Sequence, residues 1–453
     1  MNPNEEEDEE WLEKEDRISE LPDHIIHDIL RFLSIRSAAQ TKILSHRWKN
    51  VFSSIPDLDF TTLTDSPLSN RPTLMRYQMG SRYQIEPPTH IRDVNFINSV
   101  FSLRDNNYSI RTLKLKSFQL TSTAFNCLIK CPKINDIEEL DVNMKHADYF
   151  NIPWSIINCN SLKVLSLNIM YRRIKRNLNL IQPMNGEFKF LNKMILCNVP
   201  FLILFHNKSD IFTDSSFPNL KELTLISCRR MKELTLRCSG LKDLVIKNCF
   251  FLNKLDIYGL KLEKLKVENC FPNINNSNNV KIIAPIIKVL KWVVIPSIQS
   301  PKVLEISDVL EKAVIGIYSP QPSEYIIKPE EKRNLSNMII ALSRAKFLKL
   351  KYLSIQLNGD RDGDGDGDGD HDDQVLKSNS FLNHLRTVKL VGLLEYDEDI
   401  DFAKFLINNG KVLEEMVVCF GKHSKISLAR QGMIKSMIMQ CSPASFKARI
   451  LFH

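Results

Sequence analysis

Glycine is scarce in this sequence, with only 14 among 453 residues, and several of these fall in one short tract. Few positions therefore remain for the glycine-rich turns and phosphate loops of many α/β enzymes. A nucleophile elbow, an H-E-x-x-H metal motif and a dinucleotide fingerprint are also missing. The ten histidines are scattered, without carboxylate partners at a fixed spacing. We therefore expect that the protein is not an enzyme, and that it has no catalytic residue and no cofactor.

Long apolar runs and paired cysteines are missing as well. No apolar stretch approaches the roughly 18 residues that a membrane-spanning helix requires. The N-terminus has neither the cationic start nor the apolar core of a signal peptide. The ten cysteines show no pair of C-x-x-C motifs, so zinc is not expected. These observations predict a soluble protein of the cytoplasm or nucleus, with reduced cysteines and no membrane partner.

Negative charge is concentrated in two short segments. Nine carboxylates lie within residues 1–16 and eight aspartates within residues 360–373, although the whole chain carries a net charge of +8. The rest of the sequence is strongly basic, which favours either an acidic or phosphorylated ligand or simple solubility.

The second acidic segment largely alternates aspartate with glycine. Asp362, Asp364 and Asp366, followed by Gly367 and with Asp373 in the twelfth place, approximate a calcium-binding loop. Gly369, however, stands where such a loop has its apolar anchor. A low-complexity linker accounts for the spacing better than a calcium site does.

The sequence near the N-terminus predicts a small helical module. Residues 22–33 have a helical period, with Pro22 suited to the first turn, and residues 37–44 and 45–52 favour two further short helices. Trp48, Val51 and Phe52 form the apolar side of the last one. Three helices in about 40 residues expose more apolar surface than they can bury against one another. The module therefore needs a partner.

Four segments of this module, DRISELPD at 16–23, ILRFL at 29–33, TKILSHRW at 41–48 and PDLDF at 56–60, resemble an F-box. The resemblance is to the plant family of F-box, leucine-rich repeat and FBD proteins, from which Ser34 and the Val51-Phe52 pair depart. It implies docking on the Skp adaptor of an SCF-type ubiquitin ligase, and through it on cullin. The residues implied at or beside the adaptor contact are Leu21, Pro22, Ile25, Ile26, Ile29, Leu30, Leu33 and Trp48.

An L-x-x-L-x-L pattern recurs along the following region. Its intervals are 25 to 29 residues between Ile110 and Leu196 but fall to 10 or 11 between Leu220 and Val267, with weaker matches up to Ile355. One coil cannot close in about ten residues, so two short units are expected to make one coil with strands on both faces. That model places four residues inside a thin core, namely Leu225, Leu236, Ile246 and Ile257.

Smaller features complete this prediction. Cys228, Cys249 and Cys270 recur at one place in the short units and are expected to be small buried hydrophobes. Residues 95–104 favour a helix that caps the open end of the solenoid. The end of the chain, with a helix around residues 401–409, resembles the FBD region and is expected to continue the solenoid.

The predicted fold is α/β, a three-helix F-box followed by an irregular leucine-rich repeat solenoid. We expect an acidic tail at 1–16, the F-box at 17–57, a linker and cap at 58–105, repeats at 106–358, an acidic linker at 359–378 and FBD-like repeats at 379–453. The implied function is a substrate receptor that binds Skp and an unknown target protein. The alternative is a basic scaffold for nucleic acid or another acidic ligand, suggested by the YRRIKR segment at 171–176. That segment is more often a solvated loop, and nucleic acid is not the expected partner.

Overall fold

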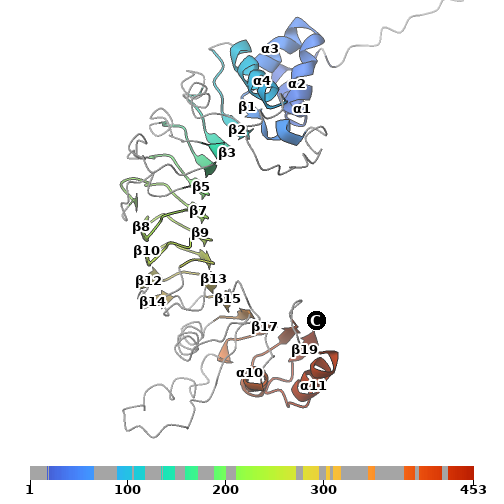
Figure 1. Cartoon of the computed structure of the whole chain (residues 1–453), viewed down its shortest axis with the longest axis vertical. Coiled ribbons are helices and arrows are strands. Elements are labelled where there is room, and N and C mark those ends of the chain that lie inside the picture. Colours follow the sequence, from blue (N-terminus) through green and yellow to red (C-terminus); the bar gives the residue numbers. More distant parts are fainter. Residues whose placement is uncertain are drawn as a thin grey trace, which may run out of the picture.

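The computed structural model shows an elongated, curved solenoid with helices at both ends (Figure 1). It describes residues 18, 20–65, 89–104, 107–117, 134, 136–147, 159–171, 188–199, 211–271, 279–294, 303–306, 310–317, 345–351, 382–392, 397–420 and 427–453. The weak repeat match at Leu353 and Ile355, the acidic segment 360–373 and residues 172–176 lie outside the described residues. No described helix is long and apolar enough to cross a membrane.

The first module consists of α1 (Asp23–Arg31), α2 (Ile35–Gln40), the 3-10 turn η1 (Thr41–Ile43) and α3 (His46–Ser54). The second predicted helix, 37–44, is thus a shorter α-helix that starts two residues earlier and ends in a tighter turn. Ser34 explains the early start, because its Oγ accepts a hydrogen bond from the Ser37 amide at 3.2 Å. Ser45 caps α3 in the same way through the Trp48 amide, at 3.3 Å.

The module joins the solenoid without a break. β1 (Asp57–Asp59) pairs in parallel with β2 (Thr112–Ser117), while η2 (Thr61–Asp65) and α4 (Thr89–Leu103) lie between them in the chain. The predicted capping helix exists but begins at Thr89, before the expected residue 95. Its aromatic residues pack on Phe60, whose ring centroid is 6.5 Å from that of Phe96 and 6.4 Å from that of Phe101.

One large parallel sheet runs through the described solenoid and contains 14 strands. Figure 1 places it on the inner side of the curve. After β1 and β2, its strands are β3 (Glu139–Ala147), β4 (Val164–Tyr171), β5 (Lys193–Cys197), β7 (Glu222–Ile226), β9 (Asp243–Lys247), β11 (Lys264–Glu268), β13 (Val289–Val294), β15 (Lys312–Ile317), β16 (Phe347–Lys351), β17 (Thr387–Val391), β18 (Glu415–Cys419) and β19 (Arg449–Phe452).

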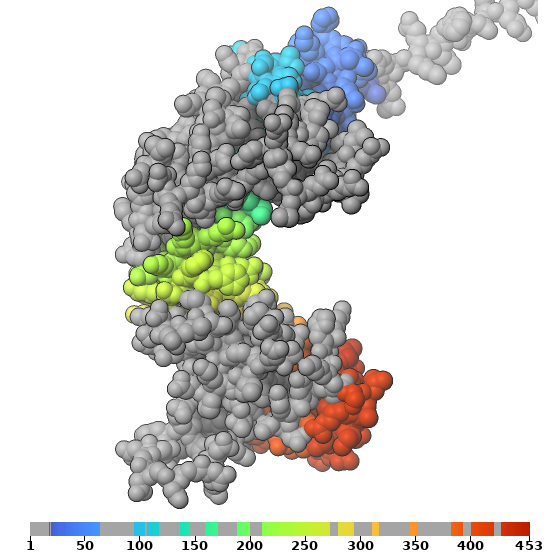
Figure 2. All heavy atoms as spheres, viewed as in Figure 1, coloured from blue at the N-terminus to red at the C-terminus, as the bar shows by residue number. Residues whose placement is uncertain are grey.

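We call residues 220–267, where the repeat interval is 10 or 11 residues, the short-period block. A second sheet covers the outer side of this block. Its strands are β6 (Phe212–Thr213), β8 (Glu233–Arg237), β10 (Lys254–Tyr258), β12 (Asn279–Ala284) and β14 (Val303–Ile306). From β6 to β14 the chain alternates between the two sheets, so two short units make one coil. Figure 2 shows residues 211–271, in green and yellow, packed into a continuous surface.

The predicted thin core is confirmed. Leu225, Leu236, Ile246 and Ile257 are all buried, although they come from opposite sheets. A polar exception is Thr235 of β8, which is buried beside Leu236 rather than directed to solvent. Strict alternation of buried and exposed residues therefore fails in β8, as it does in β18, where three consecutive residues are buried.

The three recurring cysteines are buried, as predicted. Their thiols lie close to backbone carbonyl oxygens: the Cys249 Sγ is 3.3 Å from that of Lys247, and the Cys270 Sγ is 3.5 Å from that of Ile246. Before these cysteines, the backbone turns through left-handed φ angles at Ser227 (53°), Asn248 (54°) and Asn269 (51°). Asparagine tolerates left-handed φ angles better than most residues do. The side-chain amide of Asn269 also donates a hydrogen bond from Nδ2 to Oδ1 of Asn248, at 3.1 Å.

The C-terminal segment continues the large sheet, as the sequence predicts. α10 (Asp397–Asn409) lies between β17 and β18, and α11 (Leu428–Met439) lies between β18 and β19. The expected helix thus starts at Asp397, before residue 401. Apolar residues of both helices are buried, among them Leu406 and Ile407 of α10 and Ile434 and Ile438 of α11. This segment therefore closes that end of the described core.

Candidate functional site: exposed apolar residues of the first module

The core of the first module is continuous with that of the solenoid. Ile26 and Leu30 of α1 are buried with Trp48, Val51 and Phe52 of α3. Three residues of the predicted contact set, Ile26, Leu30 and Trp48, thus belong to this inner layer. They hold the helices together and can support a partner contact from beneath, but they do not offer their side chains to it.

The rest of the predicted set lies toward solvent. Ile25, Ile29 and Leu33 are exposed, and they follow one another at intervals of four residues, so they form one stripe. Pro22 is exposed and Leu21 is partly buried against the core. The wide apolar face of α1 is therefore divided into two stripes. One stripe, with Ile26 and Leu30, packs into the core, and the other remains exposed to solvent.

The sequence-based prediction missed several exposed apolar residues of the module, among them three in turns. Phe32 is 91% exposed, Ile43 is 88% exposed and Leu44 is 64% exposed. They lie in the turns after α1 and around η1, where helical periodicity assigns no face. The available signal was only that large apolar residues stand at helix ends. We call Ile25, Ile29, Phe32, Leu33, Ile43 and Leu44 together the apolar set.

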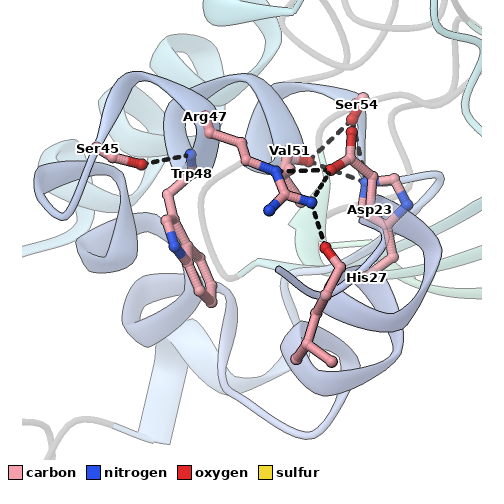
Figure 3. A network of polar contacts seen from close by, with 8 residues as sticks. Asp23, His27, Ser45, Arg47, Trp48, Val51 and Ser54 are labelled. Carbon is pink, nitrogen blue, oxygen red and sulfur yellow. Dashed lines mark hydrogen bonds and ion pairs between the residues drawn. The ribbon is translucent and has the colours of Figure 1, made fainter. Parts of the chain in front are cut away.

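Polar contacts fix α1 against α3, as Figure 3 shows. The Arg47 guanidinium donates to the Asp23 carboxylate, with Nη2 to Oδ1 at 2.8 Å and Nε to Oδ1 at 3.1 Å, and to the carbonyl oxygen of Leu21. The ring of His27 lies 3.1 Å from the carbonyl oxygen of Val51 and 3.0 Å from Ser54 Oγ. The exposed stripe of α1 is therefore presented on a braced helix.

A charged junction ties the module to the solenoid. The Asp57 carboxylate lies 2.9 Å from Arg31 of α1 and 2.7 Å from Arg111, which precedes β2. Burial alone would raise the pKa of Asp57, but hydrogen bonds involving Arg111 and Thr112 outweigh it and lower the pKa below the usual value. Arg104 is buried beside this junction and donates to the carbonyl oxygen of Ile55 at 2.5 Å. These contacts restrain the module at the start of the solenoid.

The described residues include no group of three or more His, Cys, Asp or Glu side chains placed to hold a metal ion. Burial raises the pKa of the Cys238 thiol to about 12, and burial likewise raises the pKa of Cys270. Such thiols stay protonated near neutral pH and are poor nucleophiles.

A parallel solenoid with a braced helical module that exposes apolar side chains defines a protein of the interaction-scaffold class. Comparison with protein families matches residues 18–59 to the F-box domain and residues 379–418 to FBD. The FBD match covers β17, α10 and nearly all of β18.

Whole-chain comparison gives the family. A putative F-box/FBD/LRR-repeat protein of Arabidopsis thaliana is 30% identical over 510 residues, which cover 98% of this chain and 96% of that protein. An F-box/LRR-repeat protein of the same plant is 39% identical over 160 residues, covering 34% of this chain and 32% of that protein. The chain belongs to the F-box/FBD/LRR-repeat family, and the resemblance noted in its sequence is confirmed.

Proposed function

We propose that this protein is a substrate-receptor subunit of an SCF-type ubiquitin ligase that acts in the cytoplasm or nucleus. The F-box binds the Skp adaptor, and through it cullin, while the solenoid binds the target protein. The observation that carries the proposal is the apolar set, six large apolar side chains left exposed on a module whose helices already pack on a buried core.

Burial of these side chains accounts for a stable contact. A fully buried Leu, Ile or Phe contributes about 1.5–3 kcal/mol relative to an exposed one. Phe32, Ile43 and Leu44 have most of their surface still to lose, and Ile25, Ile29 and Leu33 have less. Exposed apolar surface of this kind on a folded unit marks an interaction site. Ile26, Leu30 and Trp48 take part by holding that surface in place.

In this proposal each predicted segment of the chain has its own binding role. Residues 17–57 bind the adaptor, 106–358 and 379–453 form the target-binding solenoid, and 58–105 connect the two. The brace at Arg47 and the junction at Asp57 support this reading, because a rigid link holds a bound target at a fixed position relative to the ligase.

The family names point to adaptor or receptor proteins rather than to enzymes. The alternative, a scaffold for nucleic acid, is not favoured by these relatives. Many basic groups of the middle coils are already paired with carboxylates on neighbouring strands, as in Lys193 with Glu222 at 2.7 Å and Lys288 with Glu263 at 2.8 Å.

Binding of the full-length chain to purified Skp adaptor tests the proposal. The double variant Ile29→Asp with Phe32→Asp removes two apolar contacts and brings charges into the interface. We expect its affinity to fall at least about 100-fold, because two contacts of 1.5 kcal/mol or more correspond to that factor. An unchanged urea midpoint would show that the module remains folded.

The matched control lies at the other end of the chain. Leu428 is 85% exposed and Phe446 is 94% exposed, so Leu428→Asp with Phe446→Asp makes the same chemical change on the FBD segment. This variant should bind Skp like the parent. Undiminished binding by the F-box variant, or an equal loss in both, would contradict the proposed site.

A further inference from the structure

Two neighbouring turns of the short-period block expose a pair of arginines and a pair of phenylalanines. Arg229 and Arg230 lie in the turn between β7 and β8, and Phe250 and Phe251 lie in the turn between β9 and β10. All four side chains are exposed, with exposed fractions of 47% for Phe250 and 54% for Phe251. We call these four residues the Arg-Phe patch.

Strand register places these two turns side by side. β7 pairs with β9 and β8 pairs with β10, and both pairs keep the same offset along the chain. Because the two turns are equally long, this offset puts Arg229 beside Phe250 and Arg230 beside Phe251. Neighbouring strands are about 4.8 Å apart. The two cations and the two rings therefore form one compact surface.

These side chains have no partner within the part of the chain that the structure describes. Neither guanidinium forms an ion pair or a hydrogen bond with another described residue, and neither ring stacks on a described ring or cation. Arg237 of the same block differs, because it pairs with Asp256 at 2.7 Å and its Cζ lies 5.8 Å from the centroid of the Tyr258 ring. The fold thus uses Arg237 and leaves the patch unused.

Two further observations show that the solenoid does not require these residue types. One coil further along, Phe271 occupies the place of Phe250, but it is buried and its ring centroid lies 6.1 Å from that of Trp292. Arg230 has a left-handed φ of 60°, which glycine or asparagine adopts more readily than a long side chain does. Core packing therefore explains Phe271 but not the exposed rings, and backbone geometry does not explain Arg230.

The combination of guanidinium groups and aromatic rings favours a protein segment as the partner. Arginine and aromatic residues carry much of the binding energy at protein interfaces, and a guanidinium holds a carboxylate through two parallel hydrogen bonds. A single-stranded nucleic acid requires cations and rings along several successive nucleotides. The patch spans only two coils and ends on the β11 side, where the Phe271 ring is buried.

We propose that the Arg-Phe patch binds a segment of the target protein in which a carboxylate lies beside a large apolar side chain. This inference rests on the proposed function, in which the solenoid binds the target, and it names the chemistry of the recognised segment. Arg229 and Arg230 hold the carboxylate, and Phe250 and Phe251 cover the apolar side chain. The two arginines also select against basic segments, because like charges repel.

Selection of short random peptides displayed on phage, with the full-length protein immobilised, tests the patch. The parent should enrich peptides that combine Asp or Glu with Phe, Leu or another large apolar residue. A labelled copy of the most enriched peptide then gives affinities by fluorescence anisotropy. The variant Arg229→Gln with Arg230→Gln and the variant Phe250→Ala with Phe251→Ala should each weaken its binding at least about tenfold.

Changes in the peptide assign each contact to its side chains. Replacing the carboxylates of the peptide by amides should weaken binding to the parent but hardly alter binding to the arginine variant. Replacing its large apolar residue by Ala should likewise hardly alter binding to the phenylalanine variant, because coupling of this kind is expected of groups in contact. The control Leu260→Ala with Lys261→Gln makes similar changes in an exposed turn at the opposite edge of the block and should stay within about twofold of the parent.

The arms of this experiment separate failure of the patch from failure of the proposed function. Both patch variants should bind Skp and keep the urea midpoint of the parent, and if one of them unfolds the other decides. The variant Ile29→Asp with Phe32→Asp should still bind the peptide, so failure of the parent to bind Skp counts against the proposed function and leaves the peptide result to decide the patch. Enrichment of no peptide, enrichment of peptides without carboxylates, or equal affinity in patch and control variants would overturn the proposal. Tighter binding of a labelled single-stranded oligonucleotide, lost in both patch variants, would assign the patch to nucleic acid and overturn it too.

Discussion

The F-box module and the short-period block use apolar residues in opposite ways. In the block, Leu225, Leu236, Ile246 and Ile257 are buried between two sheets. In the module, Phe32 and Ile43 are almost fully exposed. A solenoid coil is covered by the next coil of the same chain, whereas the outer side of the module has no neighbour within the described residues. The difference shows where the chain covers its own apolar residues and where, under the proposed function, the Skp adaptor would cover them.

The largest expected difference between the two regions is in the stability lost when one apolar residue is truncated in each. Leu236→Ala should lower the free energy of unfolding by roughly 2–5 kcal/mol, because a thin core between two sheets has little slack to collapse into the cavity. Phe32→Ala should change it by no more than about 0.5 kcal/mol, since the ring is already exposed. Urea denaturation of the full-length chain measures both.

Ile257→Ala gives an independent check from the neighbouring strand of the outer sheet. A loss comparable to that of Leu236→Ala supports a single core shared by both sheets. If either core variant were as stable as the parent, the two-units-per-coil packing would be wrong. A large loss in Phe32→Ala would show instead that the ring is part of the fold.

The sequence predicted the block better than the module for a physical reason. In strands, alternation assigns each residue to a face, so the intervals of 10 or 11 residues were enough to place Leu236 and Ile257 inside. In α1, helical periodicity grouped Ile25, Ile26, Ile29 and Leu30 on one broad face but could not divide it between core and partner. Phe32, Ile43 and Leu44 lie in turns, where no period applies, and their exposure depends on the tertiary arrangement of three helices.

Long-range polar contacts also could not be predicted from the sequence. Arg104 reaches Ile55, and Asp57 links Arg31 with Arg111, across separations that no local pattern encodes. Strand register is a further example, because Lys349 and Lys389 are far apart in the chain and become neighbours only when β16 pairs with β17. Spacing alone predicted the repeats but not which outward residues align.

The junction between the two regions offers an intermediate effect. Asp57→Asn should lower the free energy of unfolding by about 1–2 kcal/mol at neutral pH, because a hydrogen-bonded carboxylate loses its charge between two arginines. The folded pKa of Asp57 lies below its ordinary value of 3.8. Its stabilisation is therefore complete above about pH 4 and is lost as the pH falls through the folded pKa.

Urea titrations of parent and variant from neutral to acidic pH test this dependence. The difference between the two proteins should be constant from about pH 7 to 5 and should shrink below about pH 4. A difference that grows on acidification would contradict the assigned sign. Lys404→Ala, which removes the exposed partner of Asp401 in α10, serves as a control with little expected effect.

The smallest expected effect sharpens the comparison within a single strand. Thr224 and Leu225 are adjacent in β7, but Leu225 is buried while Thr224 lies on the outward side between Ile195 and Val245 of the neighbouring strands. Thr224→Ala should therefore change the free energy of unfolding by no more than about 0.5 kcal/mol, although Leu225→Ala should cost roughly 2–5 kcal/mol. Urea denaturation of the two variants side by side separates the two faces of the strand.

Lys247→Ala in the neighbouring strand β9 serves as a second outward change. Since Lys247 shares Glu268 with Lys291, the loss of unfolding free energy in this variant should stay near the small value of an exposed ion pair. A Thr224→Ala loss close to that of Leu225→Ala would mean that the inner face of the curve is packed like a core, and it would remove the open surface on which the proposed binding of a target by these coils depends.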